Sequence, residues 1–254
     1  MSQTVKNILI IVAMEAEADP FVKHLDLTPL DSSFWGDDVN LPFVGFQGDY
    51  EGCKVTVATS GKDAIYGTGV DNVGTVSAAM MTFLAIQTLK SVDLVLNAGT
   101  CGGFKRKGAE IGDVFVTTGV ANHDRRIAIP GFTEWGIGKL EAVAAPNLLK
   151  VYPLFKSGIC TTGNSLDKTE ECDKLMLSND ASVKDMEAAA IAWSCALLSK
   201  KVPYLGIKVV TDIVDGDQPT HEEFMKNLGT AAESLQNALP QVLKHVCGRD
   251  ISDL

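Results

Sequence analysis

The sequence predicts an α/β fold in which helices cover both faces of a central mixed sheet, a three-layer α/β/α sandwich. Short apolar runs of strand length alternate along the chain with longer segments whose apolar residues recur at helical spacing. The 254 residues are 46% hydrophobic, enough for one sizeable core. No Pro/Gly/Ser-rich linker or repeat divides them, so we expect a single domain over residues 1–254.

The first half of the chain supplies most of the expected sheet. An apolar strand opens it, two hairpin strands follow, and an Ala-rich helix precedes a strand that runs into a glycine-rich turn. The expected elements are a strand at 7–14, a helix at 15–25, strands at 43–47 and 54–59, a loop at 61–72, a helix at 73–89, a strand at 92–97 and the turn at 98–103.

The second half continues the alternation and ends on a long helix. The loop at 123–138 has little periodicity, and long loops inside compact domains are usually functional. The expected elements are strands at 113–121, 157–162 and 204–211, and helices at 168–178, 187–198 and 221–245.

Charge and cysteine content narrow the function classes. The formal net charge is −10, which would repel a nucleic-acid backbone. The N-terminal apolar run at residues 8–14 is too short to span a membrane and lacks a signal-peptide cleavage pattern. None of the six cysteines forms a C-x-x-C pair or has histidine partners at zinc spacing. Most lie in apolar surroundings, which is typical of small hydrophobic side chains in a reducing compartment. We therefore expect a cytoplasmic protein that binds neither nucleic acid nor membrane.

Three carboxylates stand where an apolar strand ends or a helix begins: Glu17, Glu187 and Asp212. Taken singly, each has an ordinary explanation, as first-turn helix chemistry, as a charge at a helix N-terminus or as a capping side chain. Strand ends of an open α/β sheet, however, face a common crevice where ligands bind. Three carboxylates brought together there would repel one another, so at least one should have the raised pKa that acid/base chemistry needs.

Other motifs support no cofactor or metal. The loop at 67–72 has Asn72 at the third glycine position of the dinucleotide fingerprint, and no Lys-Ser/Thr pair follows to make a Walker A motif. The glycine-rich run at 97–103 lacks the fingerprint too, but we favour a ligand-facing role because glycine allows close backbone approach. The acidic stretch at 212–217 misses EF-hand spacing. His123 beside Asp124 is more often structural than catalytic, and we assign it no catalysis.

Four segments in order resemble signature segments of the 5′-methylthioadenosine/S-adenosylhomocysteine nucleosidases, within the purine nucleoside phosphorylase superfamily. They are residues 11–17 (IVAMEAE), 97–103 (NAGTCGG), 185–190 (DMEAAA) and 210–212 (VTD), and they span nearly the whole chain. The amino-acid sequence of the chain resembles plant-type members most. The resemblance implies a nucleoside phosphorylase-like fold and hydrolysis of the N-glycosidic bond of 5′-methylthioadenosine in methionine salvage, with weaker action on S-adenosylhomocysteine and no cofactor.

The resemblance also implies residue roles. Glu17 matches the carboxylate that activates the attacking water, and Asp212 matches the acid that protonates adenine N7. The remaining matches are substrate contacts. Glu187 with Met186 matches the ribose-binding pair, and the segment of Thr100, Cys101, Gly102 lines the ribose and base site, with Thr211, Met14 and Val70 as further neighbours.

Some positions depart from the family pattern. Bacterial members usually have Glu at the position of Ala16, and a purine-stacking Phe where this chain has Leu166. We therefore expect aliphatic surface to replace that ring. We expect Asp167 to reach the purine edge. Family members are typically homodimers in which a partner loop closes the 5′ pocket. Here that loop is 123–132, with Ile127, Ile129 and Phe132 as apolar cover, although it could also fold onto its own chain.

Two other functions compete with hydrolysis. A nucleoside phosphorylase needs a cationic phosphate site, often Gly and Arg after the first strand, where this chain has residues 14–17 (MEAE). A nucleoside-binding or storage protein on the same scaffold would be free to lose the three carboxylates, which this chain keeps. Hydrolysis is therefore preferred.

Overall fold

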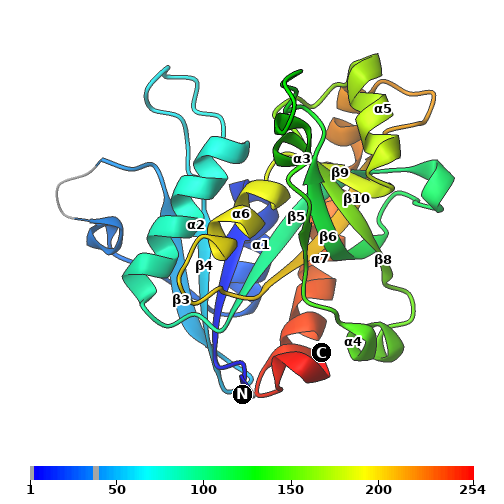
Figure 1. Ribbon diagram of the computed structural model, residues 1–254. Coiled ribbons are helices and arrows are strands. Elements are labelled where there is room, and N and C mark those ends of the chain that lie inside the picture. Colours follow the sequence, from blue (N-terminus) through cyan, green and yellow to red (C-terminus); the bar gives the residue numbers. More distant parts are fainter. Residues whose placement is uncertain (1–2, 37–39) are drawn as a thin grey trace.

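The computed structural model describes residues 3–36 and 40–254, and within them one mixed sheet of ten strands (Figure 1). Strands β1, β4, β5 and β10 pair in parallel, and β3 pairs antiparallel with β4. The strands are β1 (Asn7–Val12), β2 (Thr28–Pro29), β3 (Val44–Tyr50), β4 (Cys53–Thr59), β5 (Leu94–Gly103), β6 (Val114–Asn122), β7 (Leu140–Glu141), β8 (Lys156–Thr162), β9 (Ala181–Asp185) and β10 (Tyr204–Ile213).

One end of the sheet closes on itself. Strand β10 pairs with both β5 and β6, while β8 and β9 connect β6 back to β5. This ring of five strands brings the ends of β5, β9 and β10 next to one another, which is the position where the candidate site lies.

Helices cover both faces of the sheet, as expected for an α/β sandwich. They are α1 (Glu15–His24), α2 (Thr75–Leu89), α3 (Phe132–Ile137), α4 (Pro146–Val151), α5 (Glu170–Ser178), α6 (Ala188–Ala196) and α7 (Thr220–Val246), with 3-10 turns at Ser32–Trp35, Lys105–Lys107 and Ile251–Asp253. Among the described residues, no helix is both long and apolar enough to cross a membrane.

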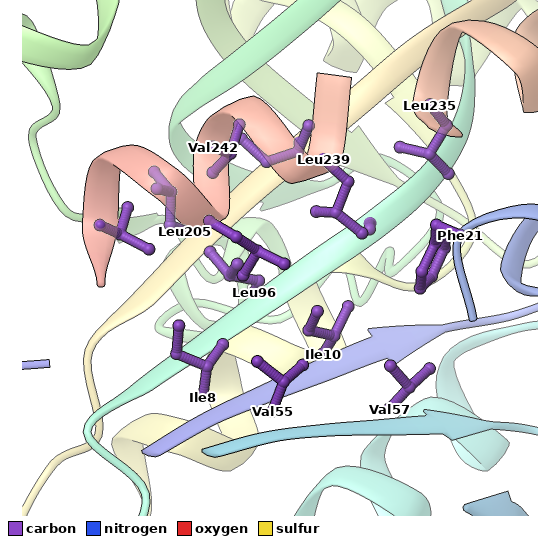
Figure 2. Close-up of a cluster of buried hydrophobic side chains, with 14 of the residues drawn as sticks. Ile8, Ile10, Phe21, Val55, Val57, Leu96, Leu205, Leu235, Leu239 and Val242 are labelled. Atoms are coloured by element: carbon purple, nitrogen blue, oxygen red, sulfur yellow. The ribbon is translucent and has the colours of Figure 1, made fainter. Parts of the chain in front are cut away.

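Alternation along the strands explains the two largest hydrophobic cores, one on each face of the sheet. In β1, Ile8 and Ile10 point to the face covered by α1 and α7, whereas Leu9 and Ile11 point to the face covered by α2 and α6. Figure 2 shows the first core, in which Phe21 and the α7 leucines lie over the strand residues. Burial on both faces is why these strands read as continuous apolar runs.

The structure differs from the sequence expectations in several places. The glycine-rich run at 98–103 is the second half of β5 rather than a turn, because β10 and β9 pair with it on both sides. The loop at 123–138 ends in helix α3. Strand β9 was not expected, since its sequence, ASVKD, is short and half polar. The short elements α4, β2 and β7 were also not foreseen.

Candidate active site

A cavity of about 260 Å³ lies where β1, β5, β9 and β10 end, and all three predicted carboxylates line it. Its wall combines strand-end residues with a few side chains from helices and loops. The lining residues are Ala13, Met14, Glu17, Val73, Asn97, Ala98, Gly99, Thr100, Cys101, Gly102, Leu166, Lys184, Asp185, Met186, Glu187, Lys208, Thr211, Asp212 and Phe224.

Glu17, in the first turn of α1, is buried against the end of β5. Its Oε1 accepts hydrogen bonds from the Thr100 amide (2.7 Å) and hydroxyl (2.6 Å), and its Oε2 accepts one from the Met14 amide (3.2 Å). Burial raises the pKa of Glu17, while these donors and the Lys208 ammonium oppose the rise. Glu17 is therefore a carboxyl group held in one orientation, and its burial favours the protonated form more than water would.

Glu187 is the N-cap residue of α6 and reaches across to the start of α2. Its Oε1 accepts a hydrogen bond of 2.8 Å from the Gly74 amide. Burial raises the pKa of Glu187 to about 7, and the Asp185 carboxylate adds to the rise. Its second oxygen has no protein donor among the described residues and remains available to a ligand.

Asp212 follows a register shift in β10, next to Gly102 of β5. Its Oδ1 accepts a hydrogen bond of 2.8 Å from the Thr211 hydroxyl. Burial raises the pKa of Asp212. The Thr211 hydroxyl and the Lys184 ammonium oppose this rise, and Glu223 adds to it. A Cβ at Gly102 would lie 2.7 Å from Asp212 Oδ2, so only glycine leaves room for the carboxyl group there.

A buried ion pair forms the floor of the cavity. Lys208 Nζ lies 2.8 Å from Asp185 Oδ2, with the two side chains 2% and 1% exposed. Burial alone would raise the pKa of Asp185 and lower that of Lys208, but the pairing reverses both shifts. Asp185 also accepts from the Thr162 hydroxyl and the Ala188 amide. Sequence reasoning missed this pair, although a lysine inside an apolar strand is an unusual signal.

The remaining predicted residues divide into two groups. Those that line the cavity beside the carboxylates are Met14, Thr100, Cys101, Gly102, Leu166, Met186 and Thr211. Val70, 61% exposed, and Asp167, which lines a neighbouring surface groove, are not among the lining residues. Ile127, Ile129 and Phe132 are partly exposed and also lie outside the lining.

Helix α7 contributes an aromatic ring that sequence reasoning missed. Phe224 lines the cavity twelve residues after Asp212, in the first turns of the helix. In the same part of α7, Glu223 accepts a hydrogen bond from the Ile213 amide (2.8 Å), and Asn227 donates one to the Thr211 carbonyl (2.9 Å). These bonds fix the end of β10, and with it the position of Asp212.

His123 lies outside the cavity lining, at the end of β6. Its Nδ1 is 3.1 Å from the Thr161 hydroxyl, and burial lowers its pKa to about 4. The ring is therefore neutral at physiological pH and packs as a structural side chain.

Comparison with known proteins places this geometry in a family. The phosphorylase superfamily model matches residues 7–244. A 5′-methylthioadenosine nucleosidase of Arabidopsis thaliana is 44% identical over 250 residues, covering 98% of this chain and 91% of the relative. A 5′-methylthioadenosine/S-adenosylhomocysteine nucleosidase of the same plant is 41% identical over 256 residues, covering 98% and 95%.

The fold agrees with these sequence matches. The apo structure of the Arabidopsis thaliana 5′-methylthioadenosine nucleosidase superimposes with a TM-score of 0.93, covering 99% of this chain and all of that one, at 44% identity. Sequence match, structural match and family model each extend over nearly the whole chain. The chain therefore belongs to the 5′-methylthioadenosine nucleosidases of the phosphorylase superfamily.

Proposed function

We propose that this chain hydrolyses the N-glycosidic bond of 5′-methylthioadenosine, releasing adenine and 5-methylthioribose. The observation that carries the proposal is the convergence of three buried carboxyl groups, those of Glu17, Glu187 and Asp212, on one cavity. The relatives' names supply the substrate. We also propose that residues 1–254 act as one nucleosidase domain.

Asp212 acts as the general acid in this mechanism. Adenine leaves poorly as an anion, so a proton delivered to N7 lowers the barrier to C–N cleavage. A carboxylic acid supplies that proton only if it is still protonated near neutral pH, and burial of Asp212 raises its pKa in that direction.

Glu17 and Glu187 act on the sugar side. Glu17 takes a proton from the attacking water, and its three fixed hydrogen bonds hold one carboxylate orientation for this purpose. Glu187, anchored on Gly74, binds the ribose hydroxyls with its free oxygen. A carboxylate there also favours the positive charge that develops on the ribosyl ring in the transition state.

The charge of the cavity favours water over phosphate as the nucleophile. Four carboxyl groups line it, and its two ammonium groups are already engaged, Lys208 by Asp185 and Lys184 by backbone carbonyls. A phosphate dianion would meet no unpaired cation there. Adenine release should therefore proceed at the same rate with and without phosphate. Release only with phosphate would make the protein a phosphorylase.

We further propose a homodimer whose second subunit covers the open side of the cavity. Large apolar side chains are exposed on α2 and α6, which pack against each other, and on residues 127–135. They include Val76 (78%), Met80 (49%), Phe83 (45%), Trp193 (49%) and Trp135 (54%). Such a surface is typical of an interface. Light scattering should give twice the chain mass for the wild type and a single chain mass for Val76→Asp. Leu154, beside α4, is 88% exposed and serves as the control, so Leu154→Asp should keep twice the chain mass.

The finer assignments follow the same relatives. We propose a preference for 5′-methylthioadenosine over S-adenosylhomocysteine, a role in methionine salvage and a cytoplasmic location, the last supported by six cysteines without a disulfide. Comparison of kcat/KM for the two nucleosides tests the preference, and equal values would refute it.

A further inference from the structure

Lys184 is a buried cation on the cavity wall for which the hydrolysis described above has no role. It lies at the end of β9, is 5% exposed and lines the cavity. Its Nζ donates to the carbonyl oxygens of Ser165 (3.0 Å), Leu166 (2.5 Å) and Asp167 (3.4 Å). An ammonium group has three N–H donors, so Lys184 commits all of them to three consecutive carbonyls of one turn.

This turn has few other anchors. Gly163 and Asn164, before it, are held by the Asp185 carbonyl and the Asp124 carboxylate. Within the part of the chain that the structure describes, the amide groups of residues 165–168 have no protein acceptor. The turn also places Leu166 on the cavity wall. The position of that wall therefore depends on the Lys184 ammonium.

The same ammonium faces Asp212 across the sheet. Asp212 of β10 pairs with Gly102 of β5, and Gly102 pairs with Lys184 of β9. The three residues form one row across the sheet. Because two strand spacings separate the outer two, their Cα atoms lie about 10 Å apart. Residues in such a row point to the same face, and Gly102 contributes no side chain between them. The Lys184 and Asp212 side chains thus approach each other over an open glycine.

We propose that Lys184 is a positioning residue for hydrolysis, which fixes the 165–167 turn against the purine and stabilises the Asp212 carboxylate formed when Asp212 protonates the leaving base. The inference rests on the proposed function. In this step the Asp212 proton moves to adenine N7, the glycosidic electron pair moves into the purine, and Asp212 is left as an anion. Lys184 keeps all its protons and loses none to the substrate.

Charges on every neighbouring element decide the pH behaviour of Asp212. Lys184 on β9 lowers its pKa, Glu223 on α7 raises it, the adjacent Thr211 hydroxyl lowers it, and burial is the largest influence. For Lys184, burial lowers the pKa and Asp212 is the strongest opposing charge. Cys101, on β5, is neutral because burial raises its pKa. Loss of Lys184 would therefore raise the pKa of Asp212 and make it a weaker acid.

The test compares Lys184→Met and Lys184→Arg, with Lys168→Met as the matched control. Lys168 is a nearby lysine paired with Asp173 and does not line the cavity. In Lys184→Met, KM should rise because the turn loosens, kcat should fall at least tenfold, and the alkaline limb of the rate profile should move up by about one pH unit or more. Lys184→Arg should raise KM but leave the alkaline limb of the rate profile at the wild-type pH. Lys168→Met should match the wild type.

An unmoved alkaline limb in Lys184→Met would overturn the electrostatic role, and an unchanged KM would overturn the role in holding the turn. A second measurement does not depend on turnover. The Asp212 carboxyl carbon, assigned by its loss in Asp212→Asn, is titrated by NMR in the wild type and in Lys184→Met. A higher pKa in the variant supports the inference even if the wild type fails to cleave 5′-methylthioadenosine, and an equal pKa refutes it even if hydrolysis is established.

Discussion

Replacement of Gly102 by alanine tests the geometry of the acid with one added methyl group. The new Cβ would lie 2.7 Å from Asp212 Oδ2 and 2.6 Å from Val214 Cγ2. Ordinary contact begins near 3.4 Å, so the Asp212 carboxyl group must move by roughly 0.7 Å or the strand must shift. Misplacement of about 1 Å at a reacting group costs on the order of 100-fold in rate. We expect kcat to fall 10- to 100-fold and stability to fall by about 1–3 kcal/mol.

The assay is adenine release from 5′-methylthioadenosine, normalised to folded protein from thermal melts. The matched control is Gly206→Ala, on β10 but outside the cavity lining, where the added Cβ would lie 2.6 Å from Thr117 Cγ2. It should show a similar loss of stability with kcat nearly unchanged. Full activity of Gly102→Ala, with its stability lowered, would show that Asp212 does not need its present position, and would refute the acid assignment.

Three further predictions follow from the buried charges. Asp212→Asn should retain nucleoside binding by calorimetry while kcat falls by about 100-fold or more; turnover at the wild-type rate would contradict general acid catalysis. Because the folded-state pKa of Glu187 is raised to about 7, its protonation stabilises the fold at low pH, and that contribution is lost as pH rises through 7. In denaturant titrations, the free energy of unfolding of the wild type should fall by about 2–4 kcal/mol more than that of Glu187→Gln between pH 4.5 and 7. The same pH dependence in both proteins would rule out this contribution of Glu187. Lys208→Met should cost about 3–5 kcal/mol at pH 7 by leaving Asp185 buried and unpaired, and Lys208→Met with Asp185→Leu should recover most of it; no recovery would contradict the pairing argument.

Much of the site could be predicted because strand ends converge. Glu17, Glu187 and Asp212 each follow or precede an apolar run in the sequence, and in an α/β sheet that position means one shared edge. The same reasoning identified the backbone around Thr100 as cavity wall. The physical signal in each case is local, since the residue type and the end of the run stand side by side in the chain.

The residues that were missed depend on long-range pairing. Nothing local distinguishes the glycine run at 98–103 from a turn, because its strand character comes from β9 and β10 on either side. Lys184 lies in a strand too short and polar to be recognised, and its partners are backbone carbonyls, which leave no mark in the sequence. Phe224 reaches the cavity only because α7 folds back over β10.

The direction of each pKa shift in the cavity follows from where the two ammonium groups stand. Asp185, in contact with Lys208, is the one cavity carboxyl group whose pKa is lowered. Glu17, Glu187 and Asp212 have no ion-pair partner among the described residues, and burial raises the pKa of each. Burial of more carboxyl groups than cations favours the protonated form of those without an ion-pair partner, Asp212 among them. An acid-catalysed departure of adenine requires a protonated Asp212, and an incoming phosphate would add negative charge to the same cavity. Hydrolysis is therefore the reaction for which this charge balance is suited.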